Sequence, residues 1–162
     1  MPIATEITTA AQMYRQNDTL LTRSIDGLTP SEFLSRPSDT TNSVFWIVGH
    51  TVWARSMALK FLGSMWTKPW LPLFARGAKI ETADRYPPLD EVLAAWKDVS
   101  TTLAKAMEEA PSEAMEAAAP EKSPSFDGKI GGMVSFLAYH ETYHVGQLAY
   151  LRKWLGHAGA VG

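Results

Sequence analysis

The stretch Met133-Val-Ser-Phe-Leu-Ala-Tyr-His-Glu-Thr-Tyr-His-Val-Gly-Gln-Leu-Ala-Tyr-Leu-Arg-Lys-Trp-Leu-Gly156 indicates the fold class of this chain. Its large apolar residues recur at helical spacing and define one face. Two basic residues near its end suit the negative end of a helix, and Gly156 is a typical residue to follow it. We therefore predict a long helix after Asp127-Gly128 and Gly131-Gly132, with one face turned to a core. That face contains Met133, Leu137, Leu148, Leu151 and Leu155.

Three further segments have the same periodicity, and helix-start residues or glycines stand at their ends. Thr29-Pro30-Ser31-Glu32 predicts an additional short helical turn. Two long connections rich in proline separate the later segments, the second running from Pro111 to Gly128. This pattern predicts an all-α protein, a four-helix bundle with long crossover connections in a single domain over residues 1–162. The three segments are Ile7 to Leu28, Val44 to Leu62 and Leu89 to Met107.

The composition excludes several classes of function. The 162 residues include no cysteine, which removes disulfides, thiolate nucleophiles, cysteine zinc sites and iron–sulfur clusters. The net charge of −2 lacks the basic excess of a nucleic-acid binder. The most apolar runs, Val44–Val48 and Ile130–Tyr139, are too short to span a membrane, and the N-terminal segment does not resemble a signal peptide. We expect a cytoplasmic protein that acts on a small-molecule substrate, without a nucleic-acid or membrane partner.

The chemistry is expected around the histidines. His140 and His144 lie four residues apart, so both project from one helix face, and that face is the apolar one. Two buried imidazoles need partners for their nitrogens, and a single metal ion satisfies both. His50, among large apolar residues of another helix, is the candidate third ligand. The alternative is three core histidines hydrogen-bonded to neighbouring side chains.

His140-Glu141-Thr142-Tyr143-His144 also matches the H-E-x-x-H pattern of zinc proteases. The match is incomplete, because no aspartate or glutamate follows Glu141 to serve as a third ligand, and no strands are predicted to flank a cleft. We interpret the protease match as coincidental. Glu141 is retained as a candidate catalytic residue that flanks the metal, with a partly exposed acid as the alternative.

The pairing of Trp46-Ile47-Val48-Gly49-His50 with the motif from His140 to Gly156 resembles the DinB-like (YfiT-like) metalloenzyme superfamily. The resemblance implies a four-helix bundle that holds zinc or nickel through His50, His140 and His144. It also implies a homodimer, and characterised members include transferases and isomerases that use the thiols bacillithiol or mycothiol. Three histidines leave an open coordination position, as in catalytic metal sites. A thiol substrate would have to be a small molecule, because the chain has no cysteine.

Residues around the predicted ligands have candidate roles. Gln147 shares their face and is a candidate catalytic residue that orients either a metal-bound water or a ligand ring; a helix-to-helix hydrogen bond is the alternative. Asp18 or Asn17 is a candidate hydrogen-bond acceptor for the ligand histidines, and a rotated, exposed position is the alternative. The connection with Trp66, Trp70 and Phe74 either caps the site or forms a satellite core. We expect a metal-dependent transferase, isomerase or hydrolase, the alternative being a dimeric metal- or ligand-binding module without turnover.

Overall fold

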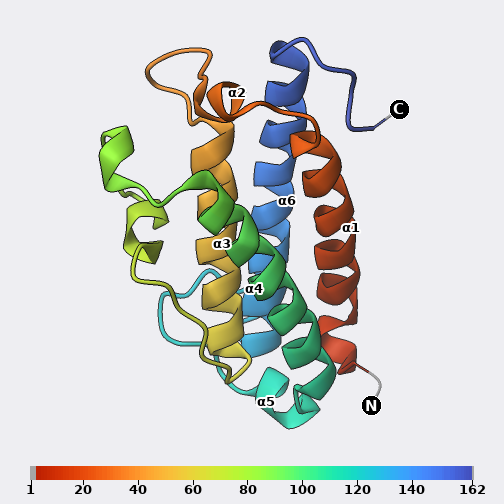
Figure 1. Ribbon diagram of the computed structural model, residues 1–162. Coiled ribbons are helices and arrows are strands. Elements are labelled where there is room, and N and C mark those ends of the chain that lie inside the picture. The colour runs from red at the N-terminus through yellow and green to blue at the C-terminus, as the bar shows by residue number, and fades with distance from the viewer. Residues whose placement is uncertain (1–2, 162) are drawn as a thin grey trace.

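The computed structural model describes residues 3–161, and within them the chain is all-α with no β-strand (Figure 1). The predicted four-helix bundle is confirmed. Met1, Pro2 and Gly162 of the predicted single domain lie outside the described residues. Shorter helices are α2, Pro30–Leu34, and α5, Ser112–Glu116, together with the 3-10 turns η1, Thr5–Ile7, η2, Leu71–Phe74, and η3, Ala83–Arg85. The four long helices are α1, Thr8–Ile25, α3, Val44–Phe61, α4, Leu89–Glu109, and α6, Ile130–Trp154.

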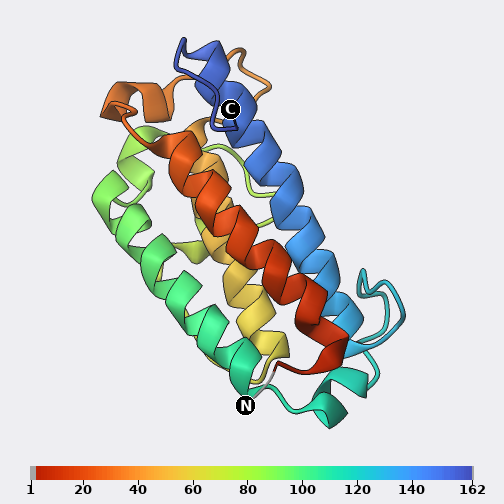
Figure 2. The same cartoon turned by 90° about the vertical axis from the view of Figure 1, so that its right-hand side faces the viewer.

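The helices run in two parallel pairs (Figures 1 and 2). Helices α1 and α6 point the same way and pack together, while α3 and α4 point the opposite way and pack together. Helix α3 also packs on α6, so these two form the centre of the bundle. Because α3 and α4 are parallel, residues 62–88 must travel back along the bundle between them. This crossover carries η2 against α3, and it then forms η3, which has no buried residue, before α4 begins.

The helix boundaries follow local side-chain chemistry. Ser43 is the N-cap of α3, and its hydroxyl accepts a hydrogen bond from the Trp46 amide at 3.2 Å. Thr29 and Glu32 form a capping box on α2, and Pro30 occupies the first helical position, as the sequence predicts. Gly63 and Gly156 follow α3 and α6 with φ of 76° and 89°, where residues with a side chain would be strained.

The predicted start of the last helix was wrong by a few residues. Helix α6 begins at Ile130 and includes Gly131 and Gly132, which were expected to precede it. At Gly132 a Cβ atom would overlap the Asp127 carboxylate, and that carboxylate accepts a hydrogen bond from the Lys129 amide at 2.9 Å. The glycine therefore lets the preceding loop fold back onto the first turn of the helix.

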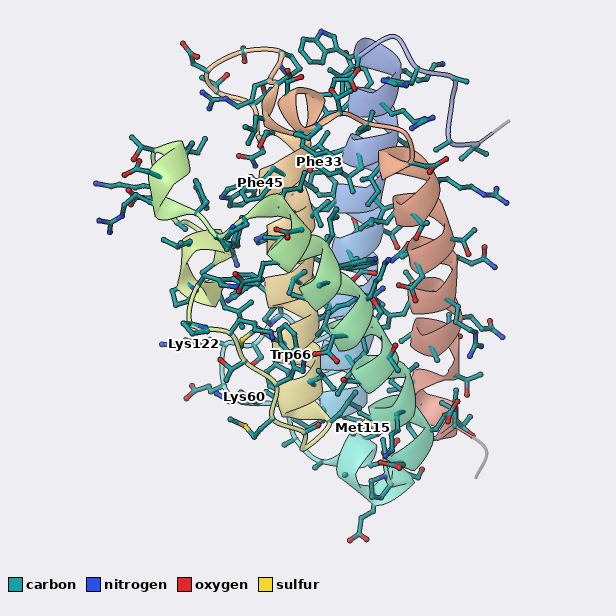
Figure 3. All side chains as sticks on the ribbon, viewed as in Figure 1. Phe33, Phe45, Lys60, Trp66, Met115 and Lys122 are labelled. Carbon is teal, nitrogen blue, oxygen red and sulfur yellow. The ribbon has the colours of Figure 1, made fainter. Side chains whose placement is uncertain are left out.

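The second connection contains a helix that the sequence did not predict. Within the expected loop from Pro111 to Gly128, residues 112–116 form α5. Its Met115 is 1% exposed and closes the end of the bundle where α4 gives way to α6 (Figure 3). A fully buried methionine side chain contributes about 1.5–3 kcal/mol relative to an exposed one, which favours the folded turn.

Helix α3 is the most deeply buried element. Between Val44 and Val52 every residue is buried, including His50 and Thr51. Helix α4, in contrast, buries one face and exposes its charges, as its amphipathic pattern predicts. None of the described helices combines the length and apolarity that crossing a membrane requires. Because α3 is so deeply buried, its polar side chains must find their hydrogen-bond partners inside the bundle.

Candidate metal centre

His50 of α3 and His140 and His144 of α6 meet in the interior of the bundle. Each offers a ring nitrogen, and these three nitrogens lie within 4.8 Å of one another. The Nε2 atoms of His140 and His144 are 3.1 Å apart, and the His50 ring centre lies 4.7 Å from that of His144. The structure thus brings together all three residues that the sequence predicts as ligands.

The His50 ring is held in position on both faces and at one nitrogen. It stacks between Trp46 and Trp53, with ring centres 4.9 and 5.2 Å away and interplanar angles of 11° and 23°. Its Nδ1 lies 2.7 Å from the Phe74 carbonyl oxygen. A carbonyl can only accept, so Nδ1 carries the proton and Nε2 presents a lone pair. That lone pair is the one available for a ligand.

His144 is oriented in the same way by a different partner. Its Nδ1 lies 2.8 Å from the Gln147 Oε1 atom, which accepts the Nδ1 proton. This bond is of the kind expected if Gln147 orients a ligand ring, and its catalytic role stays a prediction. A link to another helix is not made by this bond, because both residues belong to α6.

His140 completes the group with less support around it. Its ring is stacked on Phe136, with ring centres 6.4 Å apart and an interplanar angle of 21°. Its Nδ1 is buried and has no hydrogen-bond partner among the described residues. A buried imidazole with an unpaired nitrogen costs free energy, which a bound ligand on the other nitrogen can offset.

Burial keeps the three rings neutral at pH 7. Loss of hydration lowers the pKa of His50 to about 4, although the Phe74 carbonyl acts in the opposite direction. It also lowers the pKa of His140 to about 4, with a smaller contribution from the charge of His144. The pKa of His144 falls for the same reason, opposed by its bond to Gln147. Neutral imidazoles are the form that coordinates metal ions.

The donor set fits a transition-metal ion. Two imidazole nitrogens bound to one tetrahedral zinc ion, at about 2.0–2.1 Å each, lie about 3.3 Å from each other. The 3.1 Å between the Nε2 atoms of His140 and His144 is close to that separation. Three nitrogen donors suit zinc, nickel, copper or iron and disfavour magnesium and calcium, which prefer oxygen. A three-residue donor set also leaves a coordination position for another molecule.

Glu141 lies apart from this group. Its side chain is 0% exposed, and its two oxygens accept hydrogen bonds from Arg55 at 2.7 and 2.8 Å. Successive residues of a helix point about 100° apart, so Glu141 faces α3 at a different place from its neighbour His140. Both carboxylate oxygens are hydrogen-bonded to the Arg55 guanidinium. Glu141 does not belong to the group of candidate metal ligands that the three histidines form.

Asn17 and Asp18 also serve the helix packing around Arg55 and α6. The Asn17 amide donates to the Ala138 carbonyl at 3.4 Å and accepts from the Thr142 hydroxyl at 3.2 Å. Asp18 forms an ion pair with Arg55 at 2.8 Å. Neither residue has a hydrogen bond to the three histidines among the bonds of the described chain. Both residues therefore serve the packing of α1, Asn17 against α6 and Asp18 against α3.

The aromatic connection contributes to the site through its backbone. Trp70 and Phe74 are buried in the main core, and the Trp66 indole N–H donates to Asp98 of α4 at 2.8 Å. The side chains therefore join the main core instead of forming a separate satellite core, and the Phe74 carbonyl accepts a hydrogen bond from His50. Sequence reasoning missed this role, because no side-chain pattern marks a carbonyl that accepts a tertiary hydrogen bond.

Comparison with known proteins agrees with the motif. A family model described as the DinB superfamily matches residues 12–148, which include all three histidines. The comparisons with curated proteins and with solved structures gave no match.

Proposed function

The chain belongs to the DinB superfamily, and we propose that it is a metalloprotein that binds one zinc or nickel ion through His50, His140 and His144. The observation that carries the proposal is the convergence of three ring nitrogens within 4.8 Å in the bundle interior. Hydrogen bonds at the Nδ1 atoms of His50 and His144 leave the Nε2 atoms for the metal.

We further propose that the protein is an enzyme of the transferase, isomerase or hydrolase type. The bound metal would supply an open coordination position that lowers the pKa of a water or thiol and makes it a nucleophile near neutral pH. A thiol would come from a low-molecular-weight compound, because the sequence has no cysteine.

The residues of the chain have distinct tasks in this proposal. The three imidazoles hold the metal in their neutral form. Phe74 and Gln147 keep two of the rings in the required tautomer by accepting their Nδ1 protons. The indoles of Trp46 and Trp53 cover the His50 ring and exclude water from it. Glu141 contributes through its ion pair with Arg55, which ties α6 to α3, rather than by contact with a substrate.

A homodimer is proposed on the family resemblance, and a cytoplasmic location because a sequence without cysteine fits a reducing compartment. An exposed face of α6 supports the dimer, because its aromatic side chains are 45–68% exposed and uncharged: Tyr139, Tyr143, Tyr150 and Trp154. Sedimentation equilibrium would give twice the 17.9 kDa chain mass for a dimer and the chain mass for a monomer.

The test of the metal site is elemental analysis of purified protein after exposure to zinc or nickel. We expect about one ion per wild-type chain and little in His50→Ala, His140→Ala or His144→Ala. His157→Ala is the matched control, because His157 pairs with Glu32 at the end of the bundle, 2.7 Å from its carboxylate. If the three variants retain the metal content of the control, the assigned ligands are wrong.

The test of catalysis is a screen of low-molecular-weight thiols with electrophilic substrates, and of hydrolysable substrates with water. Wild type should turn over at least one combination, and His140→Ala should not. Stoichiometric metal without turnover in any combination would favour the binding module.

A further inference from the structure

Gly49 lies directly before the proposed ligand His50, and the space that a side chain on Gly49 would need is filled by the ring of Phe74. A Cβ atom on Gly49 would lie 2.3 Å from the Cδ1 and Cε1 atoms of the Phe74 ring and 2.7 Å from Cγ. Carbon atoms in contact stay at least about 3.4 Å apart. The Phe74 ring therefore rests directly on the α3 backbone, which only glycine permits at this position.

The same Phe74 carries the carbonyl that accepts the His50 Nδ1 proton at 2.7 Å. Its ring cannot turn away without disturbing other aromatic contacts, because Phe45, Trp70 and Tyr86 surround it with ring centres at 5.6, 5.5 and 5.2 Å. Any displacement of the ring is therefore transmitted to the backbone of Phe74. A shift of about 1 Å would stretch a 2.7 Å hydrogen bond beyond its effective range.

We propose that Gly49 is a positioning residue of the metal centre: its bare backbone seats the Phe74 ring, so that the Phe74 carbonyl holds His50 with Nε2 free for the metal. This inference rests on the proposed metal site and assigns a role to a residue that is not a ligand. Outer partners of metal-bound histidines typically affect metal affinity 10- to 100-fold.

The experiment measures Zn²⁺ affinity by competition with a chromophoric chelator. We expect Gly49→Ala to weaken Zn²⁺ binding about 10- to 100-fold. Gly146→Ala is the control, because it lies mid-helix in α6 beside the site, and a Cβ there would meet no atom within 4 Å. The control should bind Zn²⁺ as wild type does.

A double variant separates positioning from a general loss of stability. Phe74→Leu shortens the side chain but keeps the backbone carbonyl, so Gly49→Ala/Phe74→Leu should regain affinity to within a few-fold of Phe74→Leu alone. A merely structural defect would worsen in the double variant, because the leucine leaves a cavity. Wild-type affinity in Gly49→Ala, or no recovery in the double variant, would overturn the proposal.

A second measurement needs no folded variant. Nitrogen-15 NMR of the metal-free wild type should find His50 protonated at Nδ1, and a proton on Nε2 would also overturn the proposal. Failure of the metal site itself is distinguishable, because wild type and Gly146→Ala would then bind no Zn²⁺ either.

Discussion

His140 and Glu141 are neighbours in α6, yet they belong to two buried polar regions of opposite character. Around Glu141 the charges are paired: Arg55 also binds Asp18 at 2.8 Å and the Ser100 hydroxyl at 2.6 Å, and lies 4.0 Å from the centre of the Trp96 ring. Around His140 the ring nitrogens of three neutral imidazoles converge, and the buried Nδ1 of His140 lacks a partner. In the first region the opposite charges pair with each other and tie helices together, whereas the second contains three neutral rings with no charged partner.

The largest effect is expected from breaking the paired region. Arg55→Met should lower the free energy of unfolding by about 3–5 kcal/mol, because it leaves the Glu141 carboxylate buried without its partner. Urea unfolding measures this loss. Arg36→Met is the control, since its ion pair with Asp39 is exposed and worth about 0–1 kcal/mol. Equal losses in the two variants would contradict the role assigned to Arg55.

Zinc should stabilise the protein through the histidine region alone. At a free Zn²⁺ concentration of 100 times Kd, the wild-type unfolding free energy should rise by about 2.7 kcal/mol. His140→Leu should lose this gain, yet its metal-free stability should stay close to that of wild type, because the substitution removes a buried unpaired Nδ1 together with the contact between the two Nε2 atoms. Thermal unfolding with and without Zn²⁺ measures both quantities. A large loss of metal-free stability in His140→Leu would make the cluster structural instead.

Gln147 offers a finer probe of the histidine region. Gln147→Leu removes the acceptor for the His144 Nδ1 proton and should weaken Zn²⁺ binding about tenfold, or about 1.4 kcal/mol. Gln147→Glu keeps an acceptor oxygen and should retain most of the affinity. Chelator competition compares them, and equal affinities of the two variants would exclude an orienting role for the side-chain oxygen.

The smallest effect is a pH dependence of metal-free stability. The folded-state pKa of His50 is lowered to about 4 from 6.5, so the unfolded chain binds more protons between these values, and stability must fall as pH decreases through that window. Between pH 7 and pH 6 the loss is expected to be less than about 1 kcal/mol from His50. Urea titrations at several pH values measure it. His50→Phe, which cannot titrate, should flatten the dependence, and an unchanged slope would contradict the shift.

The candidate ligands could be predicted because helical geometry turns sequence spacing into direction. His140 and His144 share a face of any α-helix, and the apolar residues around His50 placed it in a core. Glu141 shows the limit of this reasoning. The alternative to a catalytic role was a partly exposed acid, yet Glu141 is fully buried. The sequence could not predict this burial, because the partner Arg55 lies 86 positions away and no local pattern connects the two residues.

The sequence by itself determined the all-α class, the four long helices and three inward histidines, because periodicity, capping residues and spacing are local properties of the chain. Only the tertiary structure decided which nitrogen of His50 and of His144 is free, and which acids pair with Arg55. It also revealed why a glycine precedes His50, since the Phe74 ring that fills this space arrives from the crossover. These decisions depend on contacts between segments far apart in the chain, and such contacts exist only once the helices have packed.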